Sequence, residues 1–234
     1  MISVVRRWLP RLAETGVGLA ALLAVTAAPQ IAQATIAPFR YTPPRRELPV
    51  TPDLFGSIAI KGGHAPQEVR WRQVMHEDLS GPGPWRAVVD RVRGLAPDER
   101  IQTINSWVNH RIQYADDRQV YGVEDHWASA SESLERGRGD CEDYAIAKLE
   151  LLREAGVPAG DLYLMVVQDL VARQAHALAA VWSQGRFVIL DSRSDEIQSA
   201  GGAADYRPIM TLGDDAVWVH GFALAAGPSA PASR

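Results

Sequence analysis

The sequence of 234 residues has a single cysteine and no excess of basic residues, and these two scarcities exclude several classes of protein. One cysteine can form neither an internal disulfide nor a cysteine-rich metal site. With 24 Lys and Arg against 28 Asp and Glu, the formal charge is −4, so the chain lacks the broad basic surface of a nucleic-acid-binding protein. The other proportions, 47% hydrophobic and 22% charged, are those of an ordinary globular protein.

Long apolar runs are also scarce, and the one that stands out lies near the N-terminus. Residues 1–34 contain three arginines among the first eleven residues, an apolar run over 17–28, and then the small residues Ala32 and Ala34. A membrane span takes about 20 residues, so this shorter run predicts a signal peptide over 1–34 and export to the periplasm. The alternative is an uncleaved N-terminal anchor.

The rest of the chain divides into a helical part and a strand-rich part. Apolar residues at spacings of three and four predict helices, whereas short runs rich in Val, Leu and aromatics predict strands. The predicted helices cover about 66–79, 84–94, 97–111 and 141–155, and the predicted strands cover 162–167, 176–182 and 186–190. The turn at 183–185 joins the last two strands into a hairpin. Helices followed by an antiparallel sheet are typical of the α+β class.

Three segments have no clear periodicity. Residues 35–64 are rich in Pro and Gly and predict an extended lead-in, and the stretch 114–127 predicts a loop. The low-complexity tail over 223–234 is expected to be disordered. The sequence therefore predicts one domain over 65–222.

The lone cysteine lies in Gly-Arg-Gly-Asp-Cys-Glu-Asp-Tyr, residues 137–144, at or next to the start of a predicted helix. Unpaired N–H groups and the helix dipole at that place favour a thiolate, so Cys141 is a candidate nucleophile. The adjacent acids Asp140, Glu142 and Asp143 raise a thiol pKa, so a cationic partner is needed. A lone cysteine is more often a small buried residue, but these polar neighbours argue against apolar burial.

Two residues of the predicted hairpin complete a catalytic arrangement. His176 opens one strand and Asp191 ends the next, and these two points meet at the same end of a hairpin. We expect Cys141 to attack a carbonyl carbon, His176 to take and return its proton, and Asp191 to orient the imidazole. Taken singly, His176 could be an ordinary core histidine and Asp191 a turn residue.

These segments resemble the bacterial transglutaminase-like cysteine proteinase family, in particular its LapG-type periplasmic adhesin proteases. The resemblance rests on Gly139-Asp140-Cys141-Glu142-Asp143-Tyr144, Gln174-Ala175-His176 and Val188-Ile189-Leu190-Asp191, and it covers roughly residues 65–215. It implies a papain-like, transglutaminase-like core with a Cys-His-Asp triad. Two departures, Ser192 after the acid and Ala177-Leu178 after the histidine, remove no catalytic group.

The same resemblance implies what the enzyme acts on and with. It implies a calcium-dependent endopeptidase that cleaves a large surface adhesin at a small-residue site near its N-terminus, which releases the adhesin and promotes biofilm dispersal. It also implies that an inner-membrane receptor for cyclic di-GMP holds the protease. Sequence alone leaves two alternatives: a transglutaminase or amide-transfer enzyme, and a non-catalytic scaffold bound to the receptor.

Calcium ligands are expected beside the nucleophile. Asp140, Glu142 and Asp143 offer hard oxygen ligands within four residues, which suits Ca²⁺, and the resemblance places the site there. The alternative is that these acids only cap a helix and occupy its first turn. Glu124-Asp125 could add ligands, whereas Asp116-Asp117 is expected on the solvated surface. Trp127 is predicted to line the cleft, assist the oxyanion hole or pack in the core.

Overall fold

The computed structural model describes residues 51–62, 66–201 and 205–223, all within one compact unit that spans residues 46–234. The predicted signal peptide over 1–34 and nearly all of the predicted tail lie outside the described residues. The α-helices are α1 (Pro66–Val74), α2 (Arg86–Val92), α3 (Pro97–Arg111), α4 (Asp117–Val120), α5 (Ala130–Arg136) and α6 (Cys141–Glu154), and a short 3-10 helix covers Ala159–Asp161. None of the helices in this part of the chain is long and apolar enough to cross a bilayer.

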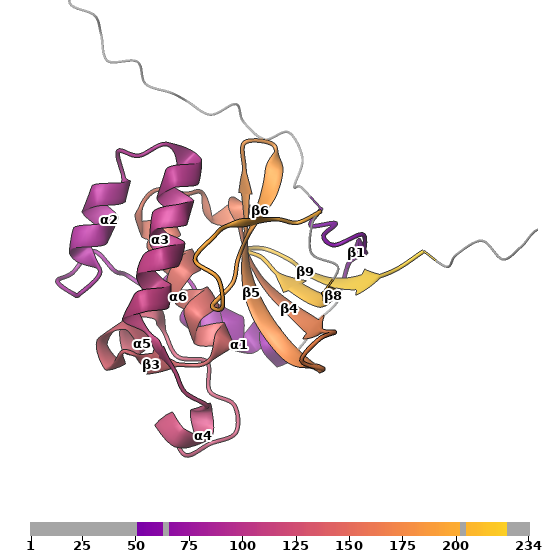
Figure 1. Cartoon of the computed structure of the whole chain (residues 1–234), viewed down its shortest axis with the longest axis horizontal. Helices are drawn as coiled ribbons and strands as arrows, with labels where there is room; N and C mark the ends of the chain where they lie inside the picture. The colour runs from indigo at the N-terminus through magenta and orange to yellow at the C-terminus, as the bar shows by residue number, and fades with distance from the viewer. Residues whose placement is uncertain (1–50, 63–65, 202–204, 224–234) are drawn as a thin grey trace, which may run out of the picture. The chain divides into compact units, whose positions relative to one another are not determined.

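A seven-stranded antiparallel sheet follows the helices in the chain and takes one strand from before them. Its strands are β1 (Ile58–Lys61), β4 (Leu162–Asp169), β5 (Gln174–Ser183), β6 (Arg186–Leu190), β7 (Gln198–Ser199), β8 (Tyr206–Leu212) and β9 (Val217–Gly221). Their order across the sheet is β1-β9-β8-β4-β5-β6-β7 (Figure 1). A second, parallel pair joins β2 (Gln113–Tyr114) to β3 (Arg138–Gly139), directly before α6.

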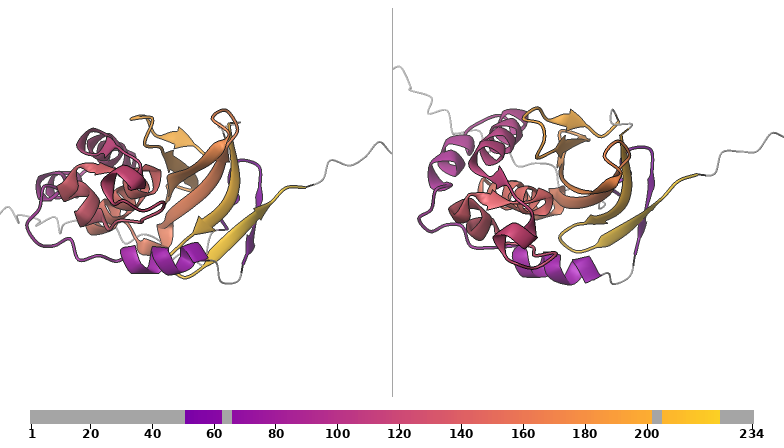
Figure 2. Two further views of the ribbon diagram at one scale, coloured as in Figure 1. Left: turned by 90° about the horizontal axis from the view of Figure 1, so that it is seen from below. Right: turned by 60° about the horizontal axis from the view of Figure 1, so that its bottom comes forward.

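Helix α6 lies between the sheet and the other helices, as the two views of Figure 2 show. Ten of its 14 residues are buried, from Asp143 to Leu152, so it is enclosed on nearly every side. Its apolar residues share one core with α3, α5 and the inner side of β4 and β5. The helix ends where Gly156 adopts a φ of 95°, a conformation that favours glycine. The first residue of α6 is thus fixed to a well-packed element.

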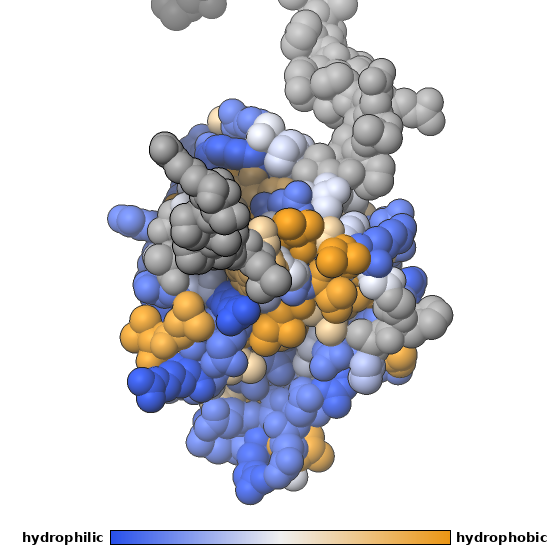
Figure 3. All heavy atoms as spheres, turned by 90° about the vertical axis from the view of Figure 1, so that its right-hand side faces the viewer, coloured by the Kyte–Doolittle hydropathy of each residue, from blue (hydrophilic) through white to orange (hydrophobic). Residues whose placement is uncertain are grey.

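The helical layer leaves the β1 edge of the sheet open. Ile58 and Ile60 of β1 are 53% and 58% exposed, and Val219 of β9, directly opposite Ile60, is 45% exposed. Figure 3 looks onto this side of the molecule and shows hydrophobic residues gathered among hydrophilic ones. A separate apolar core, which includes Met165, Phe187 and Trp218, packs on the sheet face away from the helices.

The predicted α+β class is confirmed, with Cys141 at the first position of a helix. The helix predicted over 97–111 and the strand predicted over 186–190 match α3 and β6. The prediction over 66–79 was too long, because the chain turns at His76, whose φ is 63°. The loop predicted over 114–127 contains α4, and the lead-in predicted over 35–64 contains strand β1. The sheet therefore includes residues that precede the domain predicted over 65–222.

Candidate active site

Cys141 is the first residue of α6, and the turn before it depends on glycine. Gly137 ends α5 with a φ of 68°. A Cβ on Gly139 would lie 2.7 Å from the Cβ of Asp143, so only glycine fits there. The thiol is half-buried, and its Sγ donates to Oε2 of Glu142 at 3.2 Å. A second contact, from the backbone of Ala177, ties the sulfur to strand β5 beside His176.

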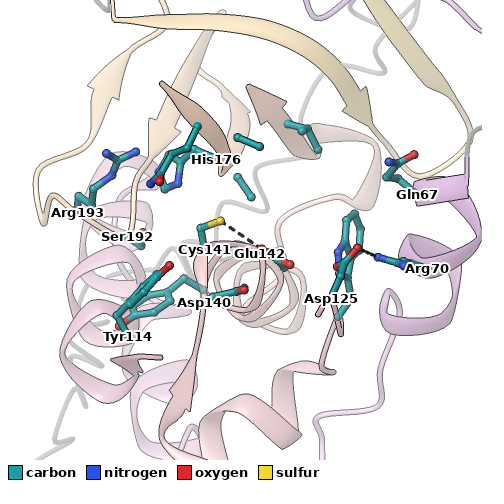
Figure 4. Close-up of a pocket in the computed structure, with 16 residues that line it drawn as sticks. Gln67, Arg70, Tyr114, Asp125, Asp140, Cys141, Glu142, His176, Ser192 and Arg193 are labelled. Atoms are coloured by element: carbon teal, nitrogen blue, oxygen red, sulfur yellow. Dashed lines mark hydrogen bonds and ion pairs between the residues drawn. The ribbon is translucent and has the colours of Figure 1, made fainter. Parts of the chain in front are cut away.

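His176 and Asp191 meet at one end of the β5–β6 hairpin, as the sequence predicts. Nε2 of His176 lies 2.9 Å from Oδ1 of Asp191, and the two side chains are only 5% and 3% exposed. The bond engages Nε2, which leaves Nδ1 as the ring nitrogen available to a thiol. Figure 4 shows His176 directly above the thiol of Cys141, at the same end of one cleft.

Two further side chains hold Asp191, and sequence analysis missed both. The hydroxyl of Tyr206, from β8, donates to Oδ2 of Asp191 at 2.5 Å, and its ring stacks on His176 with centroids 5.9 Å apart. The backbone N–H of Arg193 donates to Oδ1 at 3.0 Å. Burial raises the pKa of Asp191, but the bonds from His176 and Tyr206 outweigh burial and hold that pKa below its usual range. Asp191 is therefore ionised in the folded protein at neutral pH.

A cleft of about 670 Å³ contains the sulfur and the imidazole. Trp127 lines this cleft and also packs against the main core. The structure therefore agrees with two of the three predictions for Trp127, the cleft and the core. An ion pair between Arg70 of α1 and Asp125 closes one end (Figure 4). Arg193, whose guanidinium pairs with Asp169 at 2.7 Å, lies at the other end. Beside the histidine the wall is made of the small residues Ala175 and Ala177.

The electrostatic setting of the thiol opposes ionisation. Burial, followed by the negative charges of Glu142 and Asp140, raises the pKa of Cys141 well above its ordinary value. The contact with the Ala177 backbone lowers it, but by less. A thiol held this way stays protonated at neutral pH, so the acids around it need a compensating positive charge before Cys141 can act as a nucleophile.

A cluster of carboxylates lies beneath the sulfur and includes an acid that the sequence analysis placed wrongly. Asp117 was expected on the surface, but it is 2% exposed, because α4 packs against β3, the strand that leads into α6. Its Oδ2 accepts the backbone N–H of His126, whereas Oδ1 has no hydrogen-bond partner among the described residues. Ligand atoms lie within 4.8 Å of one another in the sets Asp117–Asp140–Asp143 and Asp117–Asp125–Glu142.

This cluster fits a calcium ion better than it fits a helix cap alone. Asp143 does serve as a cap, since its carboxylate accepts the backbone N–H groups of Asp140 at 3.3 Å and Ala128 at 3.0 Å. The buried Oδ1 atoms of Asp117 and Asp140, however, have no donor in the described part of the chain. Buried carboxylate oxygens without a donor, in a cluster whose ligand atoms lie within 4.8 Å of one another, suit the oxygen coordination of Ca²⁺.

Burial and crowding raise the pKa values of three of these acids. Burial and the neighbouring Glu142 raise the pKa of Asp140 to about 10. Burial likewise raises the pKa of Asp143 to about 7, against the bonds from Ala128 and Asp140, and it raises that of Asp117. Without a cation the cluster therefore holds protons near neutral pH that a bound metal would have to displace.

Comparisons with known proteins place these residues in a wider setting. A family model described as bacterial transglutaminase-like cysteine proteinase (BTLCP) matches residues 93–220, which include Cys141, His176 and Asp191. The solved structure of Legionella pneumophila LapG is 28% identical over 58% of this chain and 75% of that chain, with a TM-score of 0.52.

Two other solved forms of that protein are equally similar. Calcium-bound LapG gives a TM-score of 0.53 at the same identity and coverage, and EGTA-treated LapG gives 0.52 with 73% of that chain covered. No curated protein matches the sequence of this chain.

Proposed function

Because the chain belongs to the bacterial transglutaminase-like cysteine proteinase family, we propose that it is a thiol endopeptidase with Cys141 as nucleophile, His176 as base and Asp191 as orienting acid. The observation that carries the proposal is the buried bond between Nε2 of His176 and Asp191. It leaves Nδ1 of His176 free at the cleft, where Cys141 heads helix α6. The same division of labour operates in other thiol proteases.

The reaction follows from these positions. Nδ1 of His176 takes the proton of the Cys141 thiol, and the thiolate attacks the carbonyl carbon of the scissile peptide bond. The C–N bond then breaks, His176 gives its proton to the departing amine, and a thioester remains on Cys141. His176 next takes a proton from water, whose oxygen attacks the thioester, and the carboxylate product leaves as the thiol is restored. Asp191 stabilises the imidazolium in both half-reactions.

We propose calcium as the cofactor, held by Asp117, Asp140, Glu142 and Asp143. Calcium bound there would supply the positive charge that the acidic surroundings of the thiol require. A Glu142 carboxylate engaged as a ligand no longer accepts the thiol proton, so Cys141 can turn to His176. The calcium-bound and EGTA-treated forms of LapG support a calcium site in the family.

The substrate, location and partner are proposals that rest on the likeness to LapG-type proteases. We propose that the enzyme works in the periplasm after cleavage of residues 1–34, and that it cuts the N-terminal region of a large surface adhesin. The small residues Ala175 and Ala177 beside the catalytic histidine suit a close-fitting main chain with small side chains. Release of the adhesin would promote biofilm dispersal, and an inner-membrane receptor for cyclic di-GMP would hold the protease.

Incubation with the N-terminal region of an adhesin encoded beside the gene tests the substrate. We expect mass spectrometry to detect two fragments produced by cleavage at a small-residue site. An adhesin whose small residues at that site are replaced by leucine should give no fragments. An intact adhesin alongside cleaved unrelated peptides would overturn the substrate but not the protease. Incorporation of a labelled amine without peptide cleavage would instead identify an amide-transfer enzyme.

Tyr206→Phe tests whether the hydroxyl of Tyr206 helps Asp191 to orient His176. The change removes the hydrogen bond to Asp191 and keeps the ring on His176. A hydrogen bond to a charged group contributes about 1.5–3 kcal/mol, so kcat should fall about 10- to 100-fold with KM unchanged. The lost bond lowers the pKa of Asp191 in the wild type, so the acidic limb of the pH–kcat profile should move to higher pH.

A matched variant separates this effect from a general loss of a tyrosine hydroxyl. Tyr163 donates to the carbonyl of Gly160 at 2.8 Å on the sheet face away from the helices, so Tyr163→Phe should leave kcat and the pH profile unchanged. A Tyr206→Phe enzyme with wild-type kcat and an unmoved profile would show that Asp191 needs no such support.

A further inference from the structure

A buried lysine on the nucleophile's own helix has no part in the reaction described above. Lys148 lies two turns after Cys141 on α6 and is 0% exposed. Its Nζ has no hydrogen-bond partner among the described residues. The same atom lies 5.8 Å from the centroid of the Tyr144 ring. Burying an ammonium group is costly unless its surroundings compensate. The residues around Lys148 should therefore show what it interacts with.

Two asparagines of α3, Asn105 and Asn109, bind the loop that begins with Asp191. Nδ2 of Asn105 donates to the carbonyls of Ser194 at 2.9 Å and Asp195 at 2.8 Å. Nδ2 of Asn109 donates to the carbonyls of Asp191 at 3.1 Å and Ser194 at 2.9 Å. Nε2 of Gln102, also on α3, donates to the carbonyl of Asp195, so α3 fastens residues 191–195 by five bonds to main-chain oxygens. Helix α6 packs against α3.

The other ends of these two amides complement the lysine. The Oδ1 atoms of Asn105 and Asn109 are buried and accept no hydrogen bond from the described residues. An ammonium group has only donors and these oxygens are only acceptors, so the unpaired groups are complementary, and a water molecule between them would satisfy both sides. Buried polar groups without a partner are uncommon, and these three lie on two helices that pack against each other, which favours a common role.

The charges around Lys148 belong to the same loop. Burial lowers the pKa of Lys148 to about 7, and the negative charges of Asp191 and then Asp195 act in the opposite direction. Asp191 opens the loop and Asp195 closes it. Lys148 and the loop that carries the orienting acid are therefore coupled electrostatically across the packing of α6 on α3.

We propose that Lys148 is a positioning residue of the active site: with Asn105 and Asn109 it holds the 191–195 loop, and so keeps the carboxylate of Asp191 on Nε2 of His176. This inference rests on the proposed function, because Asp191 matters as the acid that orients His176. Lys148 does not line the cleft, so it should affect turnover and not substrate binding.

Lys148→Met tests the proposal, since methionine fills a similar volume without donors or charge. We expect kcat to fall about 10- to 100-fold, as for other residues that orient a catalytic group through a partner, with KM within about twofold of the wild type. The downfield proton resonance of His176 Nε2–H, in protein labelled with ¹⁵N-histidine, should shift or broaden. Asn109→Ala removes the other side of the same support and should act in the same direction.

The control is Leu152→Ala, one turn further along the same side of α6 and fully buried. It should lower the melting temperature but leave kcat and the His176 resonance unchanged. If Lys148→Met keeps the wild-type kcat and resonance, the proposal is overturned, whatever Asn109→Ala does; it is also overturned if Leu152→Ala reproduces the effects of Lys148→Met. If Lys148→Met does not fold, Lys148→Leu takes its place, because Asn109 bonds the Asp191 carbonyl by itself and does not report on the lysine. A fully active Asp191→Ala enzyme would instead refute the proposed function.

Discussion

Replacing Cys141 by alanine is expected to lower the rate of peptide cleavage by roughly 10⁴-fold or more. The change removes the only thiol of the chain, and the other catalytic groups cannot form a thioester without it. Cys141 is half-buried at a helix start where alanine is well tolerated, so the variant should fold with a similar melting temperature. The measurement is kcat/KM on a peptide that spans the cleavage site.

His176→Ala should cause a comparable loss, and the double variant should be no worse than either single one, because the two side chains act as a unit. His76 is the control, since its side chain is 47% exposed and pairs with Asp214 away from the cleft, and its replacement by asparagine should leave the rate unchanged. Cleavage or adhesin release that survives Cys141→Ala would favour the non-catalytic scaffold that the sequence leaves open.

Removal of calcium should stop turnover, and Asp117→Asn should weaken calcium binding about 10- to 100-fold. Asp117 offers a buried, unpartnered Oδ1 to the cluster, and its Oδ2 accepts the backbone N–H of His126. In Asp117→Asn the amide oxygen still accepts from His126, so the NH2 group replaces the charged ligand atom. Calorimetry gives the dissociation constant. Asp116→Asn is the matched control, because Asp116 is exposed on the adjacent position and should not change calcium affinity.

The acid cluster also fixes the sign of the pH dependence. The pKa values of Asp143 and Asp140 are raised to about 7 and about 10 in the metal-free protein, from an ordinary 3.8. The folded state therefore binds more protons than the unfolded state. Metal-free stability should fall as the pH rises from about 4, up to about 7 through Asp143 and up to about 10 through Asp140. Calcium should release protons on binding and remove this fall. A melting temperature without calcium that is flat from pH 5 to 8 would contradict the account.

The sequence predicts the candidate catalytic residues better than it predicts the residues that hold them in place. Cys141, His176 and Asp191 could be assigned because a helix start and the ends of one hairpin are local features that bring specific atoms together. The acids Asp140, Glu142 and Asp143 lie next to the nucleophile in the chain. The bond between His176 and Asp191 confirms that the two ends of the hairpin meet, and the catalytic roles of the three residues stay predictions.

Asp117, Tyr206 and Lys148 could not be placed in this way, because each acts across a contact between distant segments. Asp117 looks like half of a solvated acid pair until α4 packs against β3 before α6, and Tyr206 reaches Asp191 from a strand that sequence patterns did not predict. Strand β8 contains Pro208, which weakens the strand signal. Helix α5, by contrast, could have been found, since Ser129 and Glu132 form the sequence pattern of a helix start, and Ser129 caps the helix.

The rate of Cys141 alkylation as a function of pH, with calcium bound, tests the central claim most directly. The chain has one cysteine, so every alkylated thiol reports on Cys141. We predict a thiolate that is already reactive below pH 7 in the wild type and a transition that moves to higher pH in His176→Ala. A thiol that titrates at or above its ordinary value of about 8.5 in both proteins would contradict an ion pair between Cys141 and His176.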